Sequence, residues 1–115
     1  MEISCHEHKG IVTLFLKGRL DSIGAEQLEK EVEKLISQIE PKLILDYAQV
    51  SYISSSGLRV IVKFAKQLRV AGKEFELINV NSDVYKVFKL TGFTGIINIS
   101  RSESGQNAGL GEGRC

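Results

Sequence analysis

Three consecutive serines before a glycine are the residues in this sequence best placed to take part in chemistry: Ser54-Ser55-Ser56-Gly57-Leu58. They precede a segment with helical spacing, and a serine at the N-cap of a helix contributes on the order of 1 kcal/mol. One cap does not explain three serines. A helix N-terminus offers free amides and the positive end of the dipole, so the fold would tolerate a phosphate on Ser56. The segment therefore has two possible roles, a helix cap and a phosphorylation site.

Groups for catalysis or metal binding are scarce in the rest of the chain. The only Gly-Lys pair, Gly72-Lys73, has no glycine five residues earlier, as a phosphate-binding loop requires. His6 and His8 lie in the predicted first strand, and two ligands are too few for a specific metal site. Cys5 has no positively charged helix terminus to activate its thiol. We therefore expect no enzymatic activity, no catalytic residues, no metal and no cofactor.

Charge is unevenly distributed along the chain, although 15 Lys and Arg against 14 Asp and Glu leave a net charge of only +1. The segment after the serines carries only basic charges: Arg59, Lys63, Lys66, Arg69 and Lys73. Such runs of charge are usually solvated surface, but the position of this basic helix beside the serines also suits it to an acidic protein partner. No aromatic residues alternate with these charges, and there is no large basic excess, so neither nucleic acid nor a membrane is expected to bind.

Hydrophobic periodicity predicts an α/β domain whose elements follow the order β-β-α-β-α-β-α-β. The helices are expected to pack on a mixed sheet that opens with a hairpin. Predicted strands span residues Glu2–His8, Ile11–Leu16, Lys42–Asp46, Glu74–Val80 and Ile96–Ile99. Predicted helices run from Ser22 to Ile39, where Pro41 stops the helix, from the serines to Gly72, and from Ser82 to Thr91. A polar loop is expected from Tyr47 to Ser56.

Composition places the chain among single-domain proteins of the cytoplasm. Apolar residues make up 43% and charged residues 25% of it, which is typical of globular domains. We expect one domain over residues 1–99 and a disordered Gly/Ser-rich tail over 100–115. No signal peptide or membrane-spanning run is evident. Cys5 and Cys115 stand at opposite ends of the chain and are expected to be free thiols, as in a reducing compartment.

Four segments in order resemble the STAS domain family, and within it the small stand-alone anti-sigma factor antagonists. They are Gly18–Asp21, Leu43–Leu58, Ala71–Val80 and Val84–Phe93, the last including Leu90-Thr91-Gly92-Phe93. The resemblance covers residues 3 to 99. In that family the motif Asp-Ser-Ser-Gly carries the phosphoacceptor serine directly before the glycine, which is Ser56 here, with Ser55 as its neighbour. Ser54 replaces the aspartate, and its hydroxyl can still accept a backbone hydrogen bond.

The resemblance implies partner switching. The unphosphorylated protein binds an anti-sigma factor, often a serine kinase that uses ATP and magnesium, and a sigma factor is freed. Phosphorylation dissociates the complex, and a phosphatase resets it. The expected partner-binding residues are Asp21, Ser54, Ser55, Ser56, Gly57, Leu58, Arg59 and Lys63, and the free protein is expected to be a monomer. Asp21 is equally suited to a second role, that of the cap of the first helix. The replacement at Ser54 favours an alternative, a constitutive STAS scaffold or transporter-associated subunit without a phosphoswitch. A third hypothesis is a small nucleotide-binding module, but the sequence lacks a phosphate-binding loop.

Overall fold

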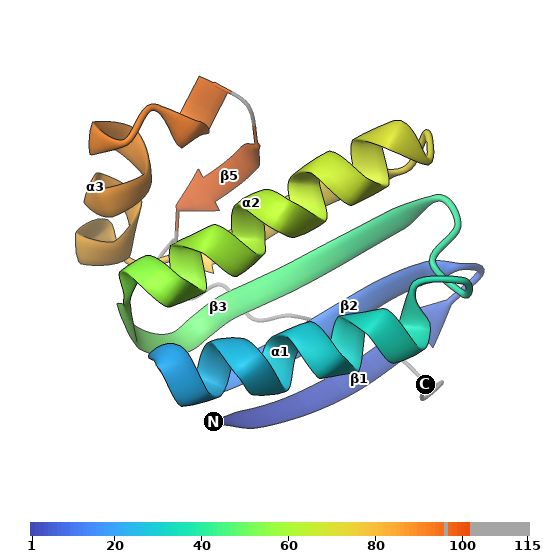
Figure 1. The fold of residues 1–115 in the computed structure, drawn as a ribbon, viewed down its shortest axis with the longest axis horizontal. Coiled ribbons are helices and arrows are strands. Elements are labelled where there is room, and N and C mark those ends of the chain that lie inside the picture. The colour runs from blue at the N-terminus through green and yellow to red at the C-terminus, as the bar shows by residue number, and fades with distance from the viewer. Residues whose placement is uncertain (96, 102–115) are drawn as a thin grey trace.

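The computed structural model describes residues 1–95 and 97–101. Within them a sheet carries two helices, α1 and α2, side by side on one face (Figure 1). The strands are β1 (Glu2–His8), β2 (Ile11–Leu20), β3 (Lys42–Ile53), β4 (Glu74–Val80) and β5 (Asn98–Arg101). The helices are α1 (Ser22–Leu35), α2 (Ser55–Val70), α3 (Ser82–Leu90) and a 3-10 turn, η1 (Phe93–Gly95). The predicted order of elements is confirmed.

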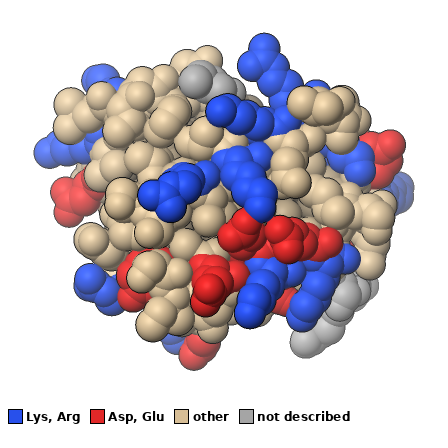
Figure 2. Space-filling model, viewed as in Figure 1, with Lys and Arg blue, Asp and Glu red and all other residues tan. Residues whose placement is uncertain are grey.

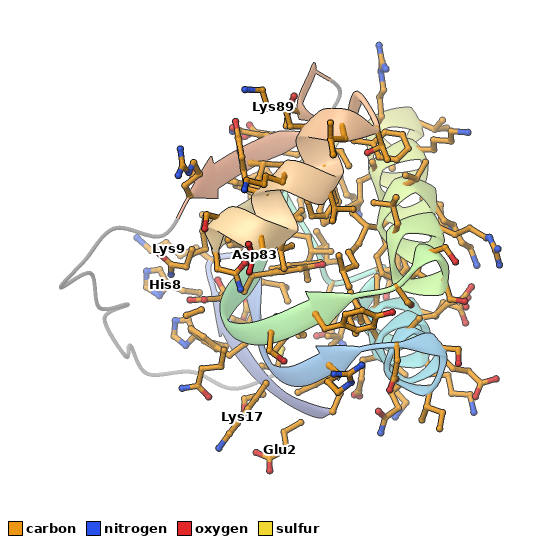
Figure 3. The ribbon with its side chains drawn as sticks, turned by 90° about the vertical axis from the view of Figure 1, so that its left-hand side faces the viewer. Glu2, His8, Lys9, Lys17, Asp83 and Lys89 are labelled. Atoms are coloured by element: carbon orange, nitrogen blue, oxygen red, sulfur yellow. The ribbon has the colours of Figure 1, made fainter. Side chains whose placement is uncertain are left out.

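The five strands are hydrogen-bonded in the order in which they occur along the chain, β1-β2-β3-β4-β5. β1 and β2 form the predicted antiparallel hairpin, and the other three pairs are parallel. Glu2 and Lys17, opposite each other in the hairpin, point away from α1 and α2 (Figure 3). The mixed α/β sheet expected from the sequence is therefore the observed one.

The hydrophobic core lies between the sheet and the helices. Alternate residues of β2 and β3 are buried, as a strand with one covered face requires: Val12, Leu14, Leu16, Leu43 and Leu45. Residues three and four apart on the helices are buried over them: Ala25, Leu28, Val32, Val60, Ile61, Phe64 and Leu68. This packing holds the N-terminal ends of both helices over one edge of the sheet (Figure 1).

The first helix is shorter than predicted. It ends at Leu35 rather than at Ile39, well before Pro41. The amide of Ile39 donates to the Leu35 carbonyl at 3.2 Å, and the amide of Glu40 then turns to the Gly10 carbonyl at 2.8 Å. Ile39 is fully buried although it is not helical. Its spacing therefore resembled a further helical turn because burial continues after the helix has ended.

The second and third strands are longer than predicted. β2 continues through Gly18, where φ is +119°, to Leu20, and β3 replaces most of the loop expected from Tyr47. Two register shifts interrupt the β2–β3 pairing. Because of these bulges the buried positions in this half of β3 are three apart, at Tyr47, Val50 and Ile53. The absence of period-two alternation concealed the strand.

Near the C-terminal end of the described chain, β5 begins two residues later than predicted and includes Ser100 and Arg101, which were assigned to the tail. Arg101 is paired with Val80 of β4. The rest of the expected tail, residues 102–115, lies outside the described residues, as does Ile96. Cys5 is disulfide-bonded, so the expectation of a free thiol is wrong for this residue.

The phenol of Tyr47 is buried against Phe88 of α3, with the two rings edge to face at 6.4 Å, and its hydroxyl has no hydrogen-bond partner among the described residues. Burial raises the pKa of this phenol. Because an unsatisfied hydroxyl costs roughly 1–3 kcal/mol, Tyr47→Phe should leave the free energy of unfolding in urea unchanged or raise it by about 1 kcal/mol. The control is Tyr85→Phe. A loss above about 1 kcal/mol in Tyr47→Phe alone would show that the hydroxyl stabilises the fold.

Candidate functional site

Three helix N-termini meet at the carboxyl edge of the parallel strands, and each is capped in the same way. The side chain of Asp21 accepts from the amide of Gly24 at 2.9 Å, and that of Asn81 accepts from Val84 at 2.8 Å. Ser54 does the same for α2, accepting from Gly57 at 3.1 Å. Each cap satisfies one of the amides that a helix leaves free at its start. The expected capping role of one serine is thus assigned to Ser54, and Asp21 is the cap of α1.

Ser54 also joins the start of α2 to the end of β2. Its amide and its hydroxyl both donate to the carbonyl of Leu20, at 2.9 and 3.0 Å. The hydroxyl therefore donates to β2 while it accepts from Gly57. A deprotonated aspartate could accept the same amide but could not donate to the Leu20 carbonyl. Ser54 thus maintains the cap without the carboxylate and adds a bond that the carboxylate cannot make. Asp21, next to Leu20 in the chain, lies beside the serine segment.

Gly57 is a glycine because β2 comes too close for any side chain. A Cβ built on Gly57 would stand 2.7 Å from the Leu20 carbonyl oxygen and 2.8 Å from Leu20 Cγ. Both contacts are shorter than real Cβ atoms show, and one of them is to backbone. The first turn of α2 is therefore pressed directly against the last residue of β2. This contact fixes the position of Ser55 and Ser56 relative to the carboxyl edge of the sheet.

Ser55 and Ser56 are left free by this arrangement. Neither hydroxyl makes a hydrogen bond to any part of residues 1–95 and 97–101. Ser55 is exposed and Ser56 is half-buried. They face different hollows: Ser56 lines a cleft of about 260 Å³ between α1 and α2, and Ser55 lines a groove on the other side of α2. Of the three serines, only Ser54 is used by the fold.

The cleft beside Ser56 contains charges of both signs. Glu26 and Glu29 reach it from α1, and Arg59 and Lys63 from α2. Lys63 is bonded to Glu29 and lies 3.4 Å from Glu33. The hydrogen bond to Glu29 raises the pKa of Lys63, which stays protonated. Figure 2 shows Lys and Arg gathered over α2, with a band of Asp and Glu beside them over α1. Lys63 thus faces α1, while Arg59 is exposed and lines both hollows.

Two exposed side chains near this edge were not singled out from the sequence. Ile23, in the first turn of α1, is 69% exposed, and Tyr52, near the end of β3, is 41% exposed. The guanidinium of Arg19 on β2 lies 4.3 Å from the centre of the Tyr52 ring, and the two residues are opposite each other in the sheet. For Ile23 the sequence offered one signal, an apolar residue two positions after the helix cap Asp21.

A metal cluster and a membrane-spanning helix are both absent from the described part of the chain. Its His, Cys, Asp and Glu residues form no group of three that could hold a metal ion. None of its helices has the length and apolar character needed to cross a bilayer.

Comparison with known proteins places this geometry in a family. The family model of the STAS domain matches residues 2–105 of this chain. The chain belongs to the STAS domain family. BtrV of Bordetella bronchiseptica is 35% identical over 89% of this chain and 88% of its own. The anti-sigma-B factor antagonist of Listeria monocytogenes is 30% identical over 84% of both chains. The predicted STAS family and the predicted similarity to the anti-sigma factor antagonists are confirmed.

Solved STAS structures share the fold. TM1081 of Thermotoga maritima superposes with a TM-score of 0.81 at 26% identity, covering 89% of this chain and 88% of its own. The anti-sigma factor antagonist SpoIIAA of Bacillus, solved unphosphorylated, gives a TM-score of 0.74 at 22% identity, covering 85% and 87%. At that identity SpoIIAA supports the fold alone.

The bonds of Ser54 predict how its substitution affects stability. Ser54→Ala removes the cap of α2 and one donor to Leu20, so the free energy of unfolding in urea should fall by about 1 kcal/mol or somewhat more. The matched control is Ser51→Ala, an exposed serine of β3, which should change it by less than about 0.5 kcal/mol. Equal effects of the two substitutions would contradict the double role of Ser54.

The contact at Gly57 predicts a larger loss. Gly57→Ala forces its new methyl group into the Leu20 carbonyl and should lower the free energy of unfolding by about 1–3 kcal/mol. Gly95→Ala is the control, because a Cβ at Gly95 meets nothing within 4 Å. If Gly57→Ala were as stable as Gly95→Ala, this result would contradict the close contact of α2 with β2 at Gly57.

Proposed function

We propose that this STAS domain is an anti-sigma factor antagonist controlled by phosphorylation of Ser56. The unphosphorylated domain binds an anti-sigma factor. The sigma factor that the anti-sigma factor restrains is then freed, so that transcription from the corresponding promoters begins. Phosphorylation of Ser56 releases the anti-sigma factor. The names of the Listeria and Bacillus relatives support the antagonist role, and the serine segment supports the switch.

The observation that carries the proposal is that the three serines differ in their hydrogen bonds. Ser54 alone caps α2 and binds β2. Ser56 precedes the buried Gly57, makes no bond that a phosphate would break, and lies in the first turn, where free amides and the helix dipole favour a negative charge. A phosphate there changes the surface without disturbing the core. This is the requirement for a modification that ejects a partner and leaves the domain folded.

The surroundings of Ser56 explain how a phosphate would act. The cleft that it lines already holds the carboxylates of Glu26 and Glu29 beside the two cations of α2. A phosphoserine brings about −1.5 to −2 further charges and tips this balanced cleft to negative. A partner whose charges fit the unmodified, balanced cleft then meets a strong negative electrostatic field. Proposed contacts of that partner are Asp21, Ser54, Ser55, Ser56, Gly57, Leu58, Arg59 and Lys63.

The proposal assigns the chemistry to other proteins. A serine kinase, which can be the anti-sigma factor itself with ATP and magnesium, transfers the phosphate, and a phosphatase removes it. The STAS domain is the substrate in both steps and is itself no enzyme. It acts in the cytoplasm, where sigma factors act, and is a monomer when free.

Binding of the anti-sigma factor should depend on charge at Ser56. Ser56→Asp should weaken the complex roughly tenfold or more, because it places a carboxylate in the contact. Ser56→Ala should bind as wild type does and stay bound when ATP and magnesium are added. The measurement is calorimetry with the purified anti-sigma factor, and Ser55→Asp, a neighbouring change of equal charge, shows whether position matters.

Tight binding by Ser56→Asp in that experiment would contradict the switch. It would favour the alternative of a constitutive STAS scaffold or transporter-associated subunit, which Ser54 in place of the family aspartate suggests. A sulfate transporter family protein of Wolinella succinogenes shares the fold, with a TM-score of 0.72 at 19% identity over 81% of this chain and 78% of its own.

A further inference from the structure

A groove runs along α2 on the side away from α1, and the proposed switch does not account for it. Two adjoining hollows of about 600 and 750 Å³ form it. They share Val62, Lys66 and Phe93. The first begins at Ser55 and the second reaches Lys73, just beyond the end of the helix. The groove therefore follows the whole length of α2, 16 residues or about 24 Å.

The floor of the groove is apolar. α2 has one stripe of residues in the core, and a second stripe, Leu58, Val62 and Ala65, lines the groove instead. Phe93 of η1 and Phe75 of β4 complete the floor. All five side chains are only partly buried. An apolar stripe at helical spacing, left partly uncovered beside a groove, is suited to the apolar side of another element.

The rim of the groove is basic, and three of its cations have no anionic partner in the part of the chain that the structure describes. Lys63 is held by Glu29 and Glu33, and Lys73 donates to the Ile36 carbonyl at 3.2 Å. Arg59, Lys66 and Arg69 form no ion pair or hydrogen bond with residues 1–95 and 97–101. All three are exposed. These charges would be complemented by carboxylates spaced along a partner.

We infer that the groove binds an acidic amphipathic helix of the anti-sigma factor, whose apolar side covers Leu58, Val62 and Phe93 while its carboxylates pair with Arg59, Lys66 and Arg69. A helix fits better than a strand, because the groove walls offer side chains and no open sheet edge to pair with strand amides. The inference rests on the proposed function for the identity of the partner. Beyond the proposed contact at the serine segment, the inference adds a second contact with the anti-sigma factor, which extends along the groove from Ser55 to Lys73.

The geometry also links the two contacts. Arg59 lines both the groove and the Ser56 cleft. A phosphate on Ser56 stands one helical turn before Arg59, where it attracts this guanidinium and repels an acidic helix. One modification at the start of α2 therefore weakens a contact that runs along the whole helix.

The test uses a synthetic peptide and the full-length, isotope-labelled protein in NMR titrations. The peptide is an amphipathic helix of about 18 residues, with leucines at spacings of three and four and glutamates elsewhere. A twin peptide carries lysine in place of every glutamate. We expect the acidic peptide to shift the amides of α2 and of the residues around Phe93, and the basic twin to leave them unchanged up to about 1 mM.

Variants of the protein separate charge from packing. Lys66→Gln with Arg69→Gln should weaken binding of the acidic peptide about fivefold, the effect of two exposed ion pairs. Lys30→Gln with Lys34→Gln, an equal charge change on the outer side of α1, should leave it unchanged. Val62→Ser should weaken binding by removing part of the floor without removing charge. Thermal melts establish that each variant is folded.

The inference would be overturned by no binding of the acidic peptide, by equal binding of the basic twin, or by shifts on another face. Broadening at α2 that grows with protein concentration alone would assign the groove to a second copy of the chain and would also overturn it. No phosphate enters these titrations, so they succeed or fail independently of Ser56 modification.

Discussion

The contact between the last residue of β2 and the first turn of α2 is the constraint on which the site depends. One carbonyl, that of Leu20, accepts two hydrogen bonds from Ser54 and leaves no room for a side chain on Gly57. Together these interactions pin the start of α2 to the sheet edge. With Ser54 held by the sheet, the next two hydroxyls are presented to solvent without a structural task. The exposure of these two hydroxyls is thus a consequence of how tightly the backbone beneath them is fixed.

The order of the strands explains why this surface lies where it does. In a sheet whose strands pair in sequence order and run parallel after the hairpin, every crossover helix starts at the same edge. Asp21, Ser54 and Asn81 cap three helices there. The edge therefore collects positive helix ends and short polar side chains. α2 adds a neutralised cation, Lys63, toward α1 and three toward solvent that are unpaired within residues 1–95 and 97–101, so its two sides are suited to different interactions.

Local patterns predicted the order of the elements, the hairpin, both ends of β4 and the start of α3, because period and capping residues are encoded within a few positions. They failed where distant contacts decided the outcome. The bulges in β3 changed its burial to a spacing of three, which hid Tyr47, Val50 and Ile53. The candidate site was predicted from Ser54–Gly57, but the sequence could not show which serine caps α2. That depended on Leu20, 34 residues away.

The most direct test of the account is mass spectrometry, intact and after digestion, of the protein purified from its own host during growth and during starvation. The account predicts one added phosphate, located on Ser56, in at least one of the two conditions. Ser54 should never carry it, because its hydroxyl is occupied by Leu20 and Gly57. A serine segment that is unmodified in both conditions, in protein recovered together with a bound partner, would contradict the switch and leave a constitutive scaffold.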